Sequence, residues 1–297
     1  MANNLRTRGE KSFAVFNYIF MTLLCIICIY PLWYVLVASL SDPVLLYMQR
    51  GILVWPLGEW SIRGYQLVME NPNIPLGFRN TLIYLGVGTF INMLITTMAA
   101  YGLSRKDCYW NGKIMKLIAF TMYFAGGLIP FYLMVKNMNL LDTYSGIILP
   151  VMVNTWNLIV MRTAFAGIPD SLEESARLDG ANDWTILWRI FFPLAQATIA
   201  VIALFYAVGW WNNWFNPSIF LSSKSKYPLQ LVLREILLKN DTSAMTQVGS
   251  IGQSQQEQYR MLVKYCTIIV ATVPILIVYP FLQRYFVKGV MVGSIKG

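Results

Sequence analysis

Residues 174–181 read Glu-Ser-Ala-Arg-Leu-Asp-Gly-Ala, and residues 190–193 follow with Ile-Phe-Phe-Pro. This polar and largely acidic segment interrupts a chain that is otherwise strongly apolar. A polar, helix-forming loop between apolar stretches needs a partner outside the lipid. The segment therefore says more about the function of the chain than any of the hydrophobic stretches around it.

The residues before the glycine predict a short helix. Asp170 follows Pro169 and precedes Glu173 by three positions, which is the pattern of an N-cap with its capping-box partner. We expect this helix over Ser171–Asp179. Gly180 can adopt a positive φ at no steric cost, so it would end the helix with an abrupt turn.

A second short helix is expected after the turn. It would begin at Asn182 or Asp183 and run to Ile190, and Pro193 would mark the return into the membrane. The two helices would form a compact elbow. A plain amphipathic connector is the alternative, but it would require neither the glycine nor the acid-small-small sequence before it.

The composition places the chain among membrane proteins. Hydrophobic residues make up 57% and charged residues 12% of its 297 residues, against roughly 25% charged residues in soluble domains. A helix that spans the bilayer needs about 20 mainly apolar residues. Six stretches meet or approach this length: Ser12–Leu40, Thr81–Leu103, Ile114–Val135, Tyr144–Phe165, Ala195–Leu221 and Leu262–Phe286. The prediction is an all-α membrane protein with about six transmembrane helices.

Two alternatives to this interpretation are disfavoured. A soluble helical protein would show a polar stripe at helical period, yet Ile19–Leu40 contains no charged residue. A cleaved signal peptide would also begin with basic residues, but the first stretch is too long for one and runs directly into Asp42-Pro43. We therefore expect the first stretch to remain as a helix of the mature chain.

The basic residues predict the orientation in the membrane. They cluster before the first stretch, between the second and third, and after the last, which places these segments and both termini in the cytoplasm. The residues concerned are Arg6, Arg8, Lys11, Arg105, Lys106, Lys113, Lys116, Arg284, Lys288 and Lys296. The segment around Glu174 falls on the same side although it is acidic, and acidic residues weigh little in this rule. The net charge of +9 is thus mainly a topology signal and gives no reason to expect a nucleic acid partner.

Residues 41–80 and 222–261 are longer than simple turns, and the same topology predicts that both are extracytoplasmic. In the second segment, the apolar spacing over Leu229–Leu238 suits a short helix on or near the membrane. Ser250–Gln258 is a polar run that is compatible with either a disordered connector or a functional loop.

Missing residues exclude several chemistries. The chain has no His, so His-based catalysis and His metal ligation are excluded. No Gly-x-x-x-x-Gly-Lys-Ser/Thr pattern occurs, so another subunit must hydrolyse ATP if transport requires it. Cys25-Ile-Ile-Cys28 has the spacing of a metal pair but lies in an apolar stretch without a second pair, and we expect core packing for it. No catalytic and no metal-binding residue is expected.

The acidic segment resembles the EAA loop of bacterial ATP-binding-cassette (ABC) importer permeases. The usual form of that loop is Glu-Ala-Ala-x3-Gly-x9-Ile-x-Leu-Pro, and this chain departs from it at Ser175 and Phe192. Further likenesses run through nearly the whole chain and resemble the carbohydrate branch of MalG-like permeases, of the LplC and YtcP type. They lie at Pro31–Ser39, Ala100–Arg105, Gly127–Pro130, Trp211-Asn212, Pro228–Glu235 and Lys288–Gly297.

The resemblance implies a fold and a function. The fold would be that of a type I importer permease, also called MetI-like, with residues 1–297 as a single transmembrane domain and residues 170–193 as a cytoplasmic coupling loop. The chain would be a sugar-transport permease of the bacterial cytoplasmic (inner) membrane, and a transporter subunit rather than an enzyme. The importer would carry oligosaccharides, driven by ATP.

The resemblance also implies partners. The chain would assemble in membrane lipid with a homologous second permease, two cytoplasmic ABC ATPase subunits and an extracytoplasmic solute-binding protein. The ATPases would bind ATP and Mg, and this chain would hold no cofactor. Glu174 would pair with a basic or polar group in a cleft of one ATPase, and closure of the ATPases would push on the loop. The coupling residues are then Glu174, Ser175, Ala176, Asp179, Gly180, Ala181, Ile190 and Pro193.

Candidate residues for the substrate path come from the fourth and fifth predicted helices. Sugars are bound by aromatic faces and by amides and hydroxyls. Residues of these types are Asn154, Trp156, Asn157, Tyr206, Trp210, Trp211, Asn212, Asn213 and Trp214. For Trp210–Trp214 an aromatic belt at headgroup level is an equally good interpretation.

Two other functions are weighed against a sugar importer. One is an ABC importer permease for a non-sugar solute such as an amino acid or phosphate, against which the fifth-helix and C-terminal likenesses speak. The other is an ion-coupled secondary carrier, which would transport without any ATPase. Such carriers usually place Asp or Glu within the bilayer, and the central parts of the six predicted spans contain neither.

Overall fold

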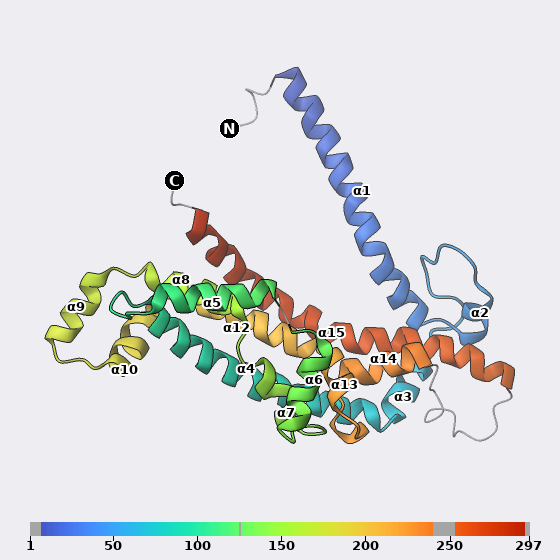
Figure 1. Ribbon diagram of the computed structural model, residues 1–297. Coiled ribbons are helices and arrows are strands. Elements are labelled where there is room, and N and C mark those ends of the chain that lie inside the picture. Colours follow the sequence, from blue (N-terminus) through green and yellow to red (C-terminus); the bar gives the residue numbers. More distant parts are fainter. Residues whose placement is uncertain (1–6, 125, 240–252, 295–297) are drawn as a thin grey trace. The chain divides into compact units, whose positions relative to one another are not determined.

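The computed structural model describes residues 7–124, 126–239 and 253–294, and these residues form helices and connecting loops with no strand among them (Figure 1). They divide into two compact units. Unit 1 comprises Met1–Asn71 and Ile236–Val273, and unit 2 comprises Pro72–Glu235 and Pro274–Gly297.

Among the described residues, unit 1 contains three whole helices and the first part of a fourth, together with the last residues of α14 (Leu229–Lys239). They are α1 (Arg8–Ser39), α2 (Pro43–Met48), α3 (Arg63–Glu70) and the first part of α15 (Gln253–Ser294). A capping box starts α1, because the Thr7 amide donates to the Glu10 carboxylate (2.8 Å) and the Glu10 amide donates to the Thr7 hydroxyl (3.3 Å). The end of α1 is tied to α3 by a hydrogen bond between the hydroxyls of Ser39 and Tyr65 (2.6 Å).

Most of α1 has no packing partner within the described residues. Its side chains are buried only at the C-terminal end, from Val37 to Ser39, while the apolar side chains before them are largely exposed. Cys25 and Cys28 are both free and exposed. The prediction of core packing for this pair is therefore wrong, because this part of α1 packs against no other described residue and leaves both side chains exposed.

Unit 2 contains the remaining helices. They are α4 (Asn73–Ser104), α5 (Asn111–Tyr123), α6 (Leu128–Asn137), α7 (Tyr144–Ile148), η1 (Leu149–Val151), α8 (Thr155–Ala166), α9 (Asp170–Leu178), α10 (Asp183–Ile186), η2 (Leu187–Phe191), α11 (Phe192–Leu194), α12 (Gln196–Trp211), α13 (Phe215–Phe220) and η3 (Lys224–Lys226); α14 (Leu229–Lys239) begins in unit 2. Within this unit, α4, α5, α8 and α12 run beside one another, and α9 and α10 lie together at one end of this group (Figure 1).

The prediction of about six transmembrane helices is confirmed. Among the described residues, three helices are long and apolar enough to cross a membrane, namely Gly9–Ser39, Asn73–Ser104 and Glu257–Ile277. Three bent helix pairs bring the number of spans to as many as six. The pair Tyr144–Val151 and Thr155–Ala166 is bent by 50°, and the pair Asp183–Leu194 and Gln196–Trp211 by 87°.

The helix bounds differ from the apolar stretches at two places. The second spanning helix begins at Asn73, eight residues before the predicted Thr81, and its first turns belong to a segment predicted to be a loop. The fifth stretch is not one helix to Leu221, because α12 ends at Trp211 and a separate short helix follows. Asn212 lies at this end with its side-chain amide donating to the Val208 carbonyl (2.9 Å), so it closes the last turn of α12. The expected helix over Leu229–Leu238 is confirmed as α14, and residues 250–252 of the polar run lie outside the described residues.

A ridge of buried residues at every fourth position runs the length of α4. Residues four apart in a helix form a row that winds slowly around its axis, so one row can meet different neighbours along its length. Asn92 in the middle of the ridge accepts a hydrogen bond from the Trp210 indole (2.7 Å) and donates to the Val151 carbonyl (3.1 Å). The ridge consists of Asn80, Tyr84, Gly88, Asn92, Thr96, Ala100 and Ser104. Its polar members are hydrogen-bonded. A slip of the helix would leave Asn80, Tyr84, Asn92 and Thr96 buried without partners, because their partners lie on other segments.

Gly88 in this ridge allows α12 to approach α4 closely. A Cβ atom at Gly88 would lie 2.4 Å from the Trp210 ring, whereas one at Gly86 on the same helix would meet no atom within 4 Å. We expect Gly88→Ala to lower the free energy of unfolding by about 1–3 kcal/mol through overpacking. The measurement is the melting temperature of the purified protein in detergent. Gly86→Ala is the matched control, because it carries the same change in helix propensity, and equal stability of the two variants would contradict this packing.

Asp142 joins two loops at the end of unit 2 opposite α9. Its carboxylate accepts from the Ser223 hydroxyl (2.5 Å), the Ser223 amide (3.0 Å) and the ammonium of Lys226 (3.0 Å). These hydrogen bonds, those from Ser223 first, hold the pKa of Asp142 well below its usual range. The loop after α6 is therefore fastened to the loop after α13 by a carboxylate that stays ionised.

Candidate functional site: the elbow between α8 and α12

The elbow predicted from the acidic segment is present. Its first helix, α9, ends in a Schellman motif, in which the Ala181 amide donates to the Ala176 carbonyl (2.9 Å) and the Gly180 amide donates to the Arg177 carbonyl (3.0 Å). Gly180 has a φ of 81°, so the left-handed turn expected at this glycine is confirmed. Figure 1 shows α9 and α10 as the two arms of the elbow.

The start of α9 differs from the prediction. The helix begins at Asp170, with Pro169 at the cap position and no side-chain cap, so the predicted capping box of Asp170 and Glu173 is wrong. The physical reason is competition for the carboxylates. Asp170 accepts from the ammonium of Lys106, and Glu173 pairs with the guanidinium of Arg105, both just beyond the end of α4.

A network of charged residues connects the elbow internally and to α4. Arg177 donates to Glu173 (2.9 Å) one turn before it and to Asp183 (2.6 Å) across the Gly180 turn. The Tyr101 hydroxyl, on α4, also donates to Asp183 (3.3 Å). The Arg105 guanidinium forms an ion pair with Glu173. Its central carbon lies 5.3 Å from the centre of the Tyr101 ring. Two arms of the elbow and the end of α4 thus share one set of ion pairs.

The pair of Lys106 and Asp170 lies at the edge of this network. Their side chains are 81% and 57% exposed, whereas those of Arg105 and Glu173 are 11% and 15% exposed. The hydrogen bond from Lys106 to Asp170 raises the lysine pKa, but water screens an interaction at such an exposed site. The pair between Arg105 and Glu173 is the shielded one of the two.

The predicted coupling residues divide between an outer and an inner side of the elbow. The exposed ones are Glu174, Ser175, Asp179, Gly180 and Pro193. Ala176, Ala181 and Ile190 are half-buried and pack against the core formed by α4, α8 and α12. Leu178, which the motif leaves unspecified, is 89% exposed at the end of α9. The elbow therefore offers an acidic, partly apolar surface while Ala176 and Ala181 face inward.

The second arm leads from the turn into α12 through irregular helix. The Asn182 side chain accepts from the Thr185 amide (2.9 Å), which confirms the predicted start of this helix. The helix then widens into a π-helical segment, Leu187–Phe191, before Pro193 and the 87° bend. Ile186, Leu187 and Phe191 are buried in the core. A wide turn and a proline beside a sharp bend give this arm a defined joint with α12.

Several candidate substrate residues serve the packing of helices in unit 2. The Tyr206 hydroxyl is hydrogen-bonded to the Thr96 hydroxyl (2.8 Å) and accepts from the backbone amide of Asn154 (3.0 Å). Trp210 stacks on Tyr84 with ring centres 6.4 Å apart and donates to Asn92. Both side chains are buried between α4 and α12.

The other candidates lie at the break in the fourth span and at the end of α12. Asn154 is exposed, and its side-chain oxygen caps α8 by accepting from the backbone amide of Asn157 (3.1 Å). The remaining positions are Trp156 and Asn212, which are exposed, Asn213 and Trp214, which are half-buried, and Asn157 and Trp211, which are buried. Arg234 of α14 lies over the Trp214 ring, 3.7 Å from its centre. The structure thus does not gather all nine candidates around one cavity among the described residues, and their role in a substrate path stays a prediction.

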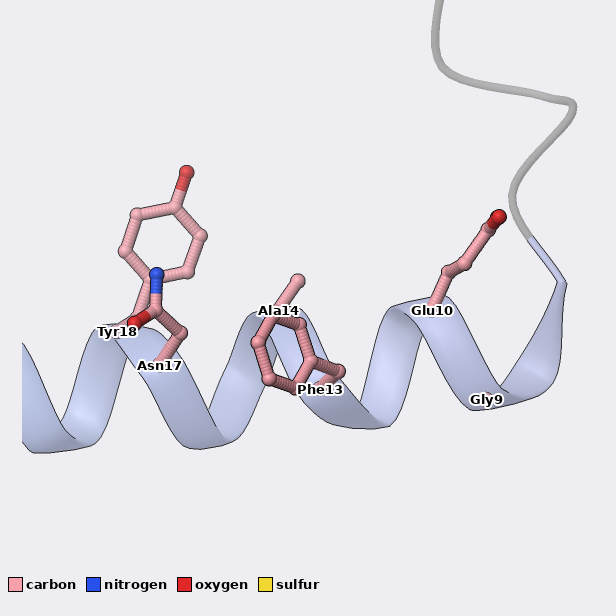
Figure 2. A pocket seen from close by; sticks show the side chains of 6 residues that line it. All are labelled: Gly9, Glu10, Phe13, Ala14, Asn17 and Tyr18. Atoms are coloured by element: carbon pink, nitrogen blue, oxygen red, sulfur yellow. The ribbon is translucent and has the colours of Figure 1, made fainter.

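A shallow depression on α1 is formed by one helix alone. Figure 2 shows that Glu10, Phe13, Asn17 and Tyr18 project from neighbouring turns of α1 around it. No second element closes over these side chains within the described residues, so the depression is part of the exposed surface of α1. The same residues contain no group of three His, Cys, Asp or Glu side chains placed to hold a metal ion.

Sequence reasoning missed Arg105, Tyr101 and Arg177 as parts of the elbow. A signal for the first was present. The loop after the second span carries Arg105 and Lys106, the loop after the fourth carries five carboxylates, and both are predicted on the same side of the membrane. Opposite charges on loops that share a side favour pairing, and the structure contains two such pairs. Their contact explains how an acidic loop and a basic loop lie at the same end.

Comparison with known proteins gives a family and several relatives. The sequence profile of the family described as "Binding-protein-dependent transport system inner membrane component" matches residues 1–292. The chain is similar to the polygalacturonan/rhamnogalacturonan transport system permease protein YtcP of Bacillus subtilis (strain 168), with 37% identity over 97% of this chain and 99% of the relative. It is also similar to Protein LplC of the same organism, with 36% identity over 98% of this chain and 97% of the relative.

A solved structure has the same fold. It is the crystal structure of a bacterial ABC transporter involved in the import of the acidic polysaccharide alginate. A chain of that transporter matches with a TM-score of 0.86 and 28% identity, over 96% of this chain and 100% of that one. The likeness covers nearly all of this chain and the whole of that one, so it is not limited to the elbow.

Proposed function

The chain belongs to the family of binding-protein-dependent transport system inner membrane components, and we propose that the carbohydrate it carries is an acidic oligosaccharide. It is the multi-pass membrane permease subunit of a carbohydrate ABC importer, with a MetI-like fold, and it works in a transport system with other subunits. It is a transport component rather than an enzyme, as its relatives are.

The nature of the cargo is inferred from two relatives that transport acidic polymers. YtcP is described as a polygalacturonan and rhamnogalacturonan permease, and the solved structure belongs to an importer of alginate. Polygalacturonan and alginate are both built from uronic acids, whose carboxylates are ionised at neutral pH. A permease similar to both over nearly its whole length is best suited to a cargo that carries such carboxylates.

One contact in unit 2 supports an acidic cargo. The Arg234 guanidinium lies over the Trp214 ring, a geometry that holds the cation in place without neutralising it. A guanidinium binds a carboxylate through two parallel hydrogen bonds, and an aromatic ring beside it offers an apolar surface to the sugar. We propose that Arg234 and Trp214 form a contact for a uronate ring.

The test of the cargo uses the assembled transporter in proteoliposomes. Oligogalacturonides are expected to stimulate ATP hydrolysis at concentrations about 10- to 100-fold lower than their methyl-esterified counterparts, the difference that one charge-assisted hydrogen bond makes. Esterification keeps chain length and ring structure and replaces each charged carboxylate by a neutral methyl ester. Arg234→Gln should reduce this preference. Equal stimulation by esterified and free oligomers, or by neutral oligosaccharides of the same length, would contradict an acidic cargo.

The coupling role belongs to the elbow. We place residues 170–193 and both termini in the cytoplasm, because the basic residues flank the corresponding ends of the spans. The observation that carries this role is the division of the elbow into two sides. Glu174 and Leu178 are exposed on α9, while Ala176 and Ala181 rest on the core of unit 2. An exposed acid beside an exposed leucine, on a helix fixed from behind, is a surface for another protein.

The proposed partner at this surface is one of two ABC ATPase subunits, which bind ATP and Mg. Glu174 makes no ion pair among the described residues, so its carboxylate is available to a basic group of the ATPase. A second, homologous permease and an extracytoplasmic solute-binding protein complete the proposed assembly. The exposed apolar length of α1 suits a position against the second permease or in lipid. If this chain alone moved solute in liposomes without an ATPase, an ion-coupled carrier would be the correct assignment instead.

A further inference from the structure

We propose that Arg105 is a positioning residue that locks the elbow to the end of α4, so that α9 and α4 move as one body during transport. This inference rests on the coupling role of the elbow proposed above. The pair of Arg105 with Glu173 is the shielded ion pair among the contacts that join the elbow to the end of α4, the others being the exposed pair of Lys106 with Asp170 and the hydrogen bond of Tyr101 with Asp183. Covalently, the elbow continues only into α8 on one side and α12 on the other.

The ion pair of Arg105 with Glu173 has the properties of a firm link. Both side chains are mostly shielded from water, at 11% and 15% exposure, and an ion pair is screened less by solvent and salt at such a site than at the surface. Arg177, which lies one turn later on α9, donates to the same carboxylate oxygen of Glu173 (2.9 Å). Loss of Arg105 would leave a half-buried carboxylate with only one basic neighbour.

Arg105 is itself fixed on the side of α4. Arg105 is the C-cap residue of α4, so its own side chain is the only flexible part between the end of α4 and the Glu173 carboxylate. The guanidinium lies beside the Tyr101 ring, and the Arg105 carbonyl accepts a hydrogen bond from the Asn111 side chain (3.0 Å). Arg162 of α8 donates to the neighbouring Leu103 carbonyl (3.0 Å). The end of α4 is thus a well-anchored support for the elbow.

The link gives a push on α9 a direct way into the helix group. Within unit 2, α4 contacts α12 through the hydrogen bond of Asn92 with Trp210 and that of Thr96 with Tyr206. A displacement of α9 would therefore reach α12 along two routes, through its own chain and through α4. Without Arg105, the exposed pair of Lys106 with Asp170 and the hydrogen bond of Tyr101 with Asp183 would be the polar contacts left between α4 and the elbow. Because water screens the exposed pair, α9 could then tilt about the turns at its two ends and absorb part of the movement.

The experiment measures transport per ATP hydrolysed in proteoliposomes that contain the complete transporter. Arg105→Gln is expected to reduce this ratio by about tenfold, within the range of known coupling energies between sites, while the complex still assembles. Arg105→Lys keeps the charge but not the planar fork, so it should recover part of the ratio. Lys106→Gln is the matched control, because it removes the neighbouring but exposed pair with Asp170, and it should behave as the wild type.

A distance measurement separates positioning from a general loss of stability. Gly102 on α4 and Ser171 on α9 are both exposed and can carry spin labels in a background in which the four native cysteines are replaced. In the wild type, the distance between the labels should stay narrow and unchanged between the nucleotide-free and ATP-bound states. In Arg105→Gln it should broaden or shift when ATP binds. An unchanged distribution in the variant would overturn the proposal, whatever its stability.

The outcomes distinguish this link from the coupling role itself. If Arg105→Gln transports as the wild type while Glu174→Lys is uncoupled, the link is refuted and the coupling role stands. If neither variant is impaired, the coupling role is refuted as well. If Lys106→Gln is impaired as strongly as Arg105→Gln, the effect comes from the charge of the loop and not from the shielded pair, which also refutes the link.

Discussion

Replacing Gly180 by proline is expected to abolish ATP-dependent uptake while leaving membrane insertion intact. The residue has a φ of 81°, and its amide donates to the Arg177 carbonyl at 3.0 Å. Proline fixes φ near −65° and has no amide hydrogen, so it can satisfy neither requirement. The Schellman turn would be lost, together with the alignment of Arg177 with Asp183 across it. The two arms of the elbow would then separate.

Two further substitutions at the same position make this prediction specific. A Cβ atom at Gly180 would meet no atom within 4 Å, so the only obstacle to a side chain is the backbone conformation. Gly180→Asn should retain most activity, because asparagine tolerates the left-handed region, and Gly180→Ala should be intermediate, with a cost of about 1–2 kcal/mol. Uptake and co-purification of the ATPase would be measured for each variant. A proline variant as active as the asparagine variant would contradict the role of the turn.

Glu174→Lys is expected to uncouple ATP hydrolysis from uptake or to prevent assembly with the ATPase. The carboxylate is exposed on α9 and has no ion-pair partner among the described residues, so its reversal should not unfold this chain. At the proposed contact it would place a lysine against a basic group. Removing one member of such an interfacial pair costs about 2–5 kcal/mol, and reversal costs more, so affinity should fall on the order of 100-fold or beyond.

The controls for this substitution separate local contact from total charge. Glu59→Lys changes the net charge of the chain by the same amount at an exposed position in unit 1. It should leave both assembly and uptake unchanged. Glu174→Gln keeps the shape and one acceptor oxygen and should give a smaller loss. Normal ATP-dependent uptake by Glu174→Lys would show that the exposed face of α9 does not contact the ATPase.

Features that depend on residues close together in the sequence were predicted correctly more often than features that depend on distant residues. The elbow and the short helix α14 were predicted because a Schellman turn, an N-cap such as Asn182 and an apolar helical face each depend on a few neighbouring residues. The capping box at Asp170 was predicted by the same local rule and was wrong. The helix begins one residue earlier than predicted, and basic residues from another loop pair with the two carboxylates that the capping box would have used.

The end of the fifth helix and the placement of Cys25 and Cys28 show the same limit. Apolar composition continues from Ala195 to Leu221, so hydropathy alone gives one helix, whereas the side chain of Asn212 closes the last turn at Trp211. For the two cysteines, an apolar stretch indicates burial in some medium. It does not reveal whether that medium is the protein core, the lipid or another chain.

The sequence by itself determined the membrane class, the approximate number of spans and the presence of an elbow with a glycine turn, because hydropathy and turn chemistry are properties of contiguous residues. Only the tertiary structure decided which side of the elbow faces outward and which residues hold it. The pairs of Arg105 with Glu173 and of Asn92 with Trp210 join residues far apart in the chain, 118 positions in the second case. Such pairs form only when packing of apolar helix faces brings their helices together, so no pattern of neighbouring residues predicts them.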